Sequence, residues 1–347
     1  MNEKSLLLAI KGLPSKRIPV WFLRQAGRYL PEYREIRKEY EFLDLCKNSK
    51  LASEITLQPL KRFDLDAAII FSDILIPATA LGQNLTFAKD HGPLLSNPVR
   101  DQISLSHLDF LHYKEKWNFV GDAISRTKSK LLPHQTMIGF AGAPFTLASY
   151  MIEGKGGTNF SETKKLAFQN QDLLKTFLMK LAEMTLHYLQ MQIEAGAEVL
   201  MLFDTWAQQI HASAFRKLVK PATDFLIAEI SKSAPIIYYS GQGSDRLYDL
   251  ENTKASALAI DWRTTLSHAK KITSNLGLNT CFQGNLDPLI LTGNEDYIRN
   301  SVREILNEAK HCELPGYIFN VGHGLLPQTP IEAIEWAIDE VRTFQNS

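Results

Sequence analysis

Cysteine is scarce in this chain of 347 residues, which has only Cys46, Cys281 and Cys312, all far apart in the sequence. An odd number at such spacing does not form a disulfide framework, and no group of Cys and His residues has the short spacing of a zinc site. We therefore expect neither structural disulfides nor a bound metal.

The chain also lacks an excess of either charge, because Lys+Arg and Asp+Glu both number 38. Nucleic-acid-binding proteins need a basic excess to neutralise phosphates, so we expect no nucleic-acid partner. No apolar run approaches the ~20 residues that span a bilayer, and the run after the polar start is too short for a signal peptide. The sequence thus predicts a cytoplasmic protein with no membrane partner.

Several familiar catalytic motifs are missing. There is no Walker loop, nucleophile elbow or HExxH pattern. The run Gly154–Thr158 resembles a phosphate-binding loop only superficially, since its spacing is wrong and no strand directly precedes it. We interpret it as a lid over a neighbouring pocket.

Short apolar segments that alternate with amphipathic helical stretches are what the chain does have. Their apolarity is continuous, which is typical of parallel strands buried on both faces. Eight such segments predict an α/β fold, namely a single (β/α)8 barrel over residues 1–347. The alternative is an open doubly wound sheet, but the glycine-rich first turn that is typical of such a sheet is absent. The predicted strands are Val20–Leu23, Ala67–Phe71, Met137–Ala141, Val199–Phe203, Ile236–Tyr239, Ala257–Ile260, Thr280–Phe282 and Tyr317–Val321.

Between these segments, the clearest predicted helix runs from Asp172 to Ala195, where apolar residues recur near every 3.6 positions. The longest interruptions, Leu81–Arg100 and Gly154–Thr163, are predicted to be elaborated loops at the carboxyl ends of the strands.

Catalytic residues of such barrels lie at the carboxyl ends of the strands. Arg24 and Arg28 follow the first predicted strand four residues apart, with only Gln25, Ala26 and Gly27 between them. Two guanidinium groups beside free backbone N–H groups would form a carboxylate receptor. The alternative is a surface corner whose arginines only meet water.

Three further strand ends carry polar residues. Asp73 follows the second strand among apolar neighbours, where a carboxylate is costly unless it is hydrogen-bonded or faces a cation; a helix-capping role is the alternative. Tyr150, after the third strand, either presents its hydroxyl to a pocket or packs in the core. His323 lies between two glycines after the eighth strand, which favours a functional role.

The motifs around these residues resemble the uroporphyrinogen decarboxylase family. The segments that carry the resemblance are Pro19–Pro31, Thr56–Pro59, Phe71–Leu75, Gln283–Pro288 and Gly322–Gly324, so it extends over essentially the whole chain. It implies a (β/α)8 barrel, usually a homodimer, that needs no cofactor or metal. It also implies a carboxy-lyase that converts the four acetate side chains of uroporphyrinogen III to methyl groups, releasing four CO2 and coproporphyrinogen III for haem synthesis.

The resemblance assigns roles to individual residues. Asp73 would stabilise a cationic transition state, and Arg24 would join it in catalysis. The residues expected to bind the tetrapyrrole are Arg24, Gln25, Ala26, Gly27, Arg28, Asp73, Tyr150, Thr205 and His323. Thr205 stands where some relatives have Ser, and it keeps the hydroxyl.

Two other functions remain open on the sequence alone. One is a corrinoid-linked methyltransferase on a related barrel, although such enzymes use zinc ligands that this chain lacks. The other is a porphyrin carrier that binds without releasing CO2.

We also expect a second copy of the chain to cover the barrel mouth, because its loops are rich in apolar residues. These are Phe140, Phe145, Tyr150, Met151 and Trp206.

Overall fold

A parallel sheet of seven strands forms the centre of the protein, whose computed structural model describes residues 4–88, 92–156 and 159–344. The sheet order is β1-β4-β5-β6-β7-β8-β9, so each strand pairs in parallel with the next one added by the chain. The bounds are β1 Ala67–Ile69, β4 Thr136–Gly142, β5 Val199–Phe203, β6 Ile236–Tyr239, β7 Ala257–Ala259, β8 Cys281–Leu286 and β9 Tyr317–Val321. Almost every residue in these strands is buried, as their continuous apolarity predicts.

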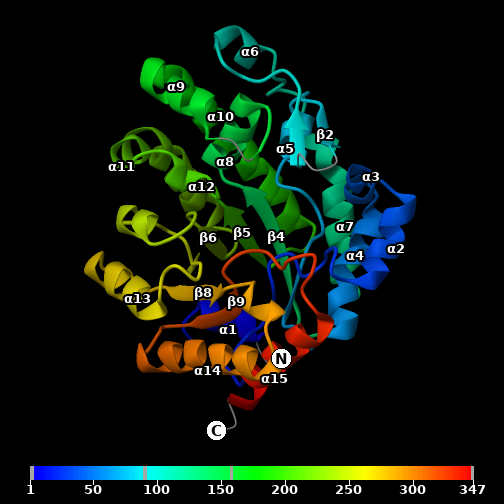
Figure 1. Cartoon of the computed structure of the whole chain (residues 1–347). Helices are drawn as coiled ribbons and strands as arrows, with labels where there is room; N and C mark the ends of the chain where they lie inside the picture. Colours follow the sequence, from blue (N-terminus) through cyan, green and yellow to red (C-terminus); the bar gives the residue numbers. More distant parts are fainter. Residues whose placement is uncertain (1–3, 89–91, 157–158, 345–347) are drawn as a thin grey trace.

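Helices surround this sheet (Figure 1). Those that connect or follow the strands are α4 Ser49–Arg62, α7 Asn118–Lys128, α8 Pro144–Glu153, α10 Gln171–Glu194, α12 Lys220–Ile230, α13 Leu266–Asn275, α14 Glu295–His311 and α15 Ile331–Phe344. The helix predicted over 172–195 is confirmed as α10, which begins where the Asn170 side chain accepts a hydrogen bond from the N–H of Leu173. None of the described helices combines the length and apolar character needed to cross a bilayer.

Shorter helical pieces fill the connections. They are α1 Ser5–Ile10, α2 Pro31–Glu39, α3 Phe42–Lys47, α5 Ile76–Ala80, α6 Gln102–Ser106, α9 Ser161–Gln169 and α11 Ala212–Ala214, the 3-10 turns η1 Lys114–Trp117, η2 Ala207–Gln209, η4 Asp245–Asp249 and η5 Ile290–Thr292, and the π-helical turn η3 Phe215–Val219. The stretch predicted as a loop at 81–100 contains an antiparallel hairpin, β2 Leu85–Ala88 and β3 Gly92–Leu95. In Figure 1, β2 and α6 extend beyond the upper end of the central strands.

The first predicted strand closes the ring without being a regular strand. Its only ladder contact among the described residues is a parallel bridge between Val20 and Phe319 of β9. On the other side, the carbonyl of Val20 accepts a hydrogen bond of 2.9 Å from the N–H of Asp66, the residue before β1. The segment therefore occupies the eighth position between β9 and β1. The predicted (β/α)8 arrangement is confirmed, with this one departure.

Asp66 explains why the first segment departs from strand geometry. Its fully buried carboxylate accepts the N–H of Val20 at 2.8 Å, a bond that a regular ladder would give to a carbonyl. The same carboxylate pairs with Arg342 of α15 at 2.7 Å and with Arg17 at 2.6 Å. One side chain thus ties both ends of the chain to the first strand of the sheet.

The apolar mouth patch predicted from the loops is not present. Phe140, Phe145 and Met151 are buried within the chain itself, with exposed fractions of 8%, 1% and 0%. Tyr150 and Trp206 are half-buried and pack on each other, with ring centroids 5.9 Å apart. The exposed patch is missing because Phe145 and Met151 face inward from α8, which packs against α10, and Phe140 lies in β4, where it packs on Phe203. These three side chains therefore need no second copy to cover them.

Candidate active site

Arg24 begins the site directly after the segment that closes the ring. Its φ of 60° places a non-glycine residue in the left-handed region, which costs on the order of 1–2 kcal/mol. The side chain is exposed, and no described residue hydrogen-bonds its guanidinium group. A strained backbone that presents an unpaired arginine to solvent is typical of a binding site, so the alternative of a simple surface corner loses support.

Gln25 maintains this turn. Its side-chain carbonyl accepts from the N–H of Phe22 at 3.1 Å, and its amide group donates to the carbonyl of Ala67 in β1 at 3.0 Å. The backbone N–H of Gln25 donates to Phe22 as well, and its carbonyl accepts from the Tyr29 hydroxyl. Every polar group of Gln25 therefore has a partner inside the chain, which makes it a positioning residue rather than a free donor for substrate.

The next N–H groups are different. Those of Ala26, Gly27 and Arg28 make no hydrogen bond to the part of the chain that the structure describes. Arg28 is exposed, and its guanidinium has no described partner either. The turn thus offers backbone donors together with two arginine side chains, which are the groups that the predicted anion receptor requires.

Asp73 follows β1 and is half-buried beside this turn. Its Oδ1 accepts from the N–H of Leu75 at 2.8 Å, while no described residue donates to Oδ2. Burial raises the pKa of this carboxyl to about 6, against the opposing effects of the Leu75 N–H and the positive charge of Arg24. The Leu75 bond closes a local turn before α5, whose N-cap residue is Leu75 and not Asp73, and it occupies only one of the two carboxylate oxygens.

Tyr150 lies on α8, close enough to Asp73 and Arg24 to interact with both charges. Burial is the main reason that its pKa is raised, Asp73 adds to the shift, and Arg24 opposes it. Gly156 lies against the ring: a Cβ there would come within 2.9 Å of Tyr150 Cε1. The hydroxyl-bearing ring therefore belongs to the same site as Asp73, under the start of the segment predicted as a lid. Gly157 and Thr158 of that segment lie outside the described residues.

Thr205 is half-buried at the end of β5, and no described residue hydrogen-bonds its hydroxyl. The preceding residue, Asp204, is fully buried and accepts from the hydroxyls of Thr146 at 2.9 Å and Tyr238 at 3.0 Å. Burial raises the pKa of Asp204 to about 6, although both hydroxyl bonds favour its charged form. Thr146 also accepts from the N–H of Trp206 at 3.2 Å, so Asp204 fixes the loop that carries Thr205.

His323 lies in the loop after β9, and close approach of two other loops requires the glycines on either side of it. A Cβ at Gly324 would come within 2.2 Å of Arg24 Cδ, and one at Gly322 would come within 2.7 Å of Asp261 Cα. Burial, followed by the charges of Arg24 and Arg263, lowers the pKa of His323. The histidine is therefore held neutral between two arginines, where its ring can hydrogen-bond a carboxylate.

The strand order gives the layout of the mouth. Going round the ring, Arg24 follows the closing segment, Asp73 follows β1, Tyr150 follows β4, Thr205 follows β5 and His323 follows β9. The structure therefore gathers Arg24, Asp73, Tyr150 and His323 around one mouth. Arg28 lies at its edge, near Tyr33, whose ring packs on Phe71 just before Asp73.

Sequence reasoning missed Asp204, Asp261 and Arg263 as parts of the site. Asp261 and Arg263 follow β7, so the strand-end rule that singles out Asp73 applies to them as well. Asp204 directly follows β5, so the same strand-end rule applies to it. Its role in holding a loop depends on contacts with Thr146 and Tyr238, which are distant in sequence.

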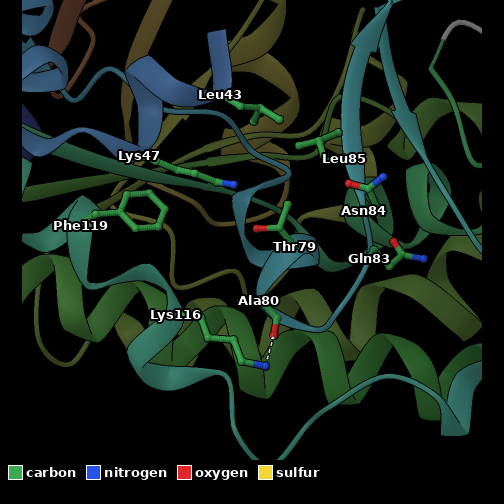
Figure 2. Close-up of a pocket in the computed structure, with 9 residues that line it drawn as sticks. All are labelled: Leu43, Lys47, Thr79, Ala80, Gln83, Asn84, Leu85, Lys116 and Phe119. Atoms are coloured by element: carbon green, nitrogen blue, oxygen red, sulfur yellow. Dashed lines mark hydrogen bonds between the residues drawn. The ribbon is translucent and has the colours of Figure 1, made fainter. Parts of the chain in front are cut away.

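A separate cavity of about 290 Å³ is lined by a different set of residues (Figure 2). It is formed by α3, α5, η1, α7 and the segment before β2, and Lys116 donates across it to the carbonyl of Ala80 at 3.0 Å. Its lining residues are Leu43, Lys47, Thr79, Ala80, Gln83, Asn84, Leu85, Lys116 and Phe119. None of them is among the strand-end residues described above, so the mouth of the ring remains the candidate active site.

Comparison with known proteins identifies the family. The model of the family described as uroporphyrinogen decarboxylase (URO-D) matches residues 1–344. The chain belongs to the uroporphyrinogen decarboxylase family. The resemblance inferred from the arginine motif and the Phe71–Leu75 segment is thereby confirmed.

Curated relatives of the decarboxylase family match nearly end to end. The uroporphyrinogen decarboxylase of Coxiella burnetii is 40% identical over 350 residues, covering 99% of this chain and 96% of that protein. That of Carboxydothermus hydrogenoformans is 38% identical over 347 residues, covering 100% and 97%.

A solved structure described as a methyltransferase from Methanosarcina mazei superposes with a TM-score of 0.77. It shares 18% sequence identity and covers 98% of each chain. At that identity the likeness shows a common fold only. In the described part of this chain, no group of three or more His, Cys, Asp or Glu side chains is placed to hold a metal ion.

Proposed function

We propose that this protein decarboxylates uroporphyrinogen III to coproporphyrinogen III, with loss of four CO2. The observation that carries the proposal is Asp73, a half-buried carboxylate with one oxygen fixed by the Leu75 N–H and the other without a described donor. Arg24, Tyr150 and His323 surround the same mouth. The family membership supports the same substrate.

The substrate explains why a carboxylate and several cations are needed together. It is a flexible macrocycle with four pyrrole N–H donors and eight carboxylate arms, four acetates and four propionates. Protonation of the ring carbon next to an acetate makes that pyrrole a cationic electron sink. CO2 then leaves and its bonding electrons enter the ring, so the substrate supplies the sink that a cofactor provides elsewhere.

The remaining steps restore the pyrrole. The exocyclic CH2 group takes up a proton to become a methyl group, and the ring carbon releases the proton that it gained. The net change at each acetate is replacement of CO2 by one proton. A propionate has one carbon too many to place its breaking bond next to the ring, so it survives.

The described residues match these demands. In this proposal Asp73 accepts pyrrole N–H bonds through Oδ2 and opposes the positive charge that develops on the ring. A preorganised charge of this kind is worth about 3–4 kcal/mol in a dry site. Arg24, Arg28, the free N–H groups of the turn and neutral His323 suit the carboxylate arms.

We further propose that the protein acts in the cytoplasm as a homodimer. The family resemblance supports the homodimer, whereas the apolar mouth that first suggested a dimer does not, because Phe140, Phe145 and Met151 are buried within the chain. Light scattering at micromolar concentration gives the oligomeric state, and an active monomer would overturn the dimer.

An anaerobic turnover assay tests the proposed function. The protein is incubated with uroporphyrinogen III, and the products are oxidised and separated by the number of carboxylates they retain. We expect hepta-, hexa- and pentacarboxylate intermediates followed by the tetracarboxylate product. Tight binding without any loss of CO2 would instead identify a carrier.

A further inference from the structure

An arginine on the opposite side of the mouth has no role so far. Arg263 follows β7, and going round the eight positions of the ring β7 lies four positions from β1, which precedes Asp73. Its side chain remains 44% exposed. A macrocycle with eight carboxylate arms extends in every direction, so the arms that point away from Arg24 and Arg28 need partners on this side.

The guanidinium group of Arg263 is held in a defined orientation. Its Nη1 donates to the fully buried carboxylate of Asp261, and its Cζ lies 4.2 Å from the centroid of the Trp262 ring. Asp261 is itself anchored, because its Oδ1 accepts the backbone N–H groups of Gly243 and Arg263 at 3.1 Å. A stacked and paired guanidinium loses little conformational entropy when it binds a ligand.

Part of the fork is still available. No described residue accepts a hydrogen bond from Nε or Nη2 of Arg263. Asp261 neutralises one edge of the guanidinium, and the other edge can donate two parallel hydrogen bonds to a carboxylate. This arrangement differs from an arginine that only closes a surface ion pair.

The loop of Arg263 is also joined to the rest of the site. Gly322 packs so closely on Asp261 and Trp262 that a Cβ would lie 2.7 Å from Asp261 Cα and 2.8 Å from the Trp262 nitrogen. On the other side of His323, Gly324 packs on Arg24 in the same way. The three loops therefore form a continuous strip in which His323 lies between the two arginines.

We propose that Arg263 binds a carboxylate arm of the macrocycle on the side opposite Asp73, with His323 beside it, and so helps to hold the substrate while successive acetates are processed. The proposal rests on the proposed function, since it assigns a further contact to the same substrate. Arg263 touches an arm rather than the reacting ring, so it contributes to binding and retention more than to the chemical step.

Kinetics of Arg263→Gln test this contact. We expect KM for uroporphyrinogen III to rise about fivefold to tenfold, the range for a partly exposed charged contact, with kcat within about twofold of wild type. Partially decarboxylated intermediates should accumulate, because they leave the weakened site more often between steps. The KM of Arg263→Lys should lie between those of wild type and Arg263→Gln, because lysine keeps the positive charge but lacks the planar fork.

The matched control is Arg126→Gln, which removes an exposed arginine at the end of α7. It should leave KM and the intermediate pattern unchanged. An Arg263→Gln variant with wild-type KM, or one in which kcat and melting temperature fall while KM stays the same, would overturn the proposal and leave Arg263 a purely structural role.

Binding separates this proposal from the proposed function. Fluorescence titration with oxidised uroporphyrin, which carries the same eight carboxylates, measures affinity without turnover. One outcome is that wild type binds uroporphyrin and yet releases no CO2 from uroporphyrinogen III. In that case the decarboxylase function fails, and the affinity of Arg263→Gln for uroporphyrin still decides the role of Arg263. We expect that affinity to fall about fivefold to tenfold. If wild type neither binds uroporphyrin nor turns over the substrate, both proposals are overturned.

Discussion

Replacing Asp73 by Asn should make the protein more stable and much less active. In the folded state, burial raises the pKa of Asp73 from 3.8 to about 6. The folded protein therefore binds the proton more tightly than the unfolded chain does. The contribution of Asp73 to stability is therefore fully present below pH 3.8 and is lost as the pH rises through about 6.

The structure sets the size of this effect. A difference of about 2 pKa units corresponds to about 3 kcal/mol of lost stability above pH 7. Unfolding entropy of about 2.1 cal/mol/K per residue gives about 0.7 kcal/mol/K for 347 residues. Because Asn cannot ionise, the variant should melt about 4 °C above wild type at pH 8 and about half as far above it at pH 5.

The activity should change in the opposite direction. Asn keeps the size of Asp but removes the charge that opposes the cationic ring, so kcat should fall by at least about 100-fold. The loss of activity is measured by turnover with HPLC of the products. The gain in stability is measured by scanning calorimetry at pH 5 and pH 8. Asp122→Asn, on the exposed face of α7, is the control and should leave activity and melting temperature unchanged. Wild-type turnover in Asp73→Asn would remove this residue from the mechanism. If Asp73→Asn melted below wild type at pH 8, burial of the charged Asp73 carboxylate would not destabilise the fold, contrary to the argument above.

The remaining predictions concern pH, the arginine turn and barrel closure. The kcat/KM of wild type should fall on the acid side with an apparent pKa of about 6 as Asp73 becomes protonated, and a flat profile from pH 5 to 8 would argue against a required carboxylate. Arg28→Lys should raise KM more than it lowers kcat, whereas Arg24→Lys should affect both; changes in stability alone would restore the surface-corner interpretation. Gly324→Ala should lower kcat/KM about 10-fold or more, because the new Cβ displaces the Arg24 side chain, and unchanged kinetics would show that Arg24 has room to move. Asp66→Asn should lower the free energy of unfolding, measured in urea, by about 2–3 kcal/mol, because two arginines and the Val20 N–H lose a charged partner. A loss below about 0.5 kcal/mol would contradict the role of Asp66 in closing the ring.

The fold could be predicted from sequence because parallel strands leave a strong local signal. Seven of the eight predicted apolar segments are strands, since each is buried on both faces and therefore continuously apolar. Val20–Leu23 carries the same signal and occupies the predicted position. It is not a regular strand because Asp66, distant in sequence, takes the N–H of Val20. The hairpin at 85–95 was missed because its short strands alternate too little to distinguish them from a loop.

The site was predictable to the extent that its residues sit at strand ends. Arg24, Asp73 and His323 do, Tyr150 lies on the helix that follows β4, and all four share one mouth. The opposite side was missed in part because Arg263 depends on Asp261 and on the packing of Gly322, which no local pattern reveals. The error about Phe140, Phe145 and Met151 has the same origin, because composition shows that these residues are apolar but not which way the strand or helix that carries each one turns its side chain.

Decarboxylation in D2O tests the central claim most directly, namely that this chain replaces each acetate CO2 by one proton using only its own residues and the substrate ring. Protein dialysed against a chelator is incubated anaerobically with uroporphyrinogen III, and CO2 and the product are quantified. We predict four CO2 per macrocycle and one carbon-bound deuterium in each new methyl group. Substrate that is bound but unchanged, or turnover that appears only when a metal or cofactor is added, would contradict the account.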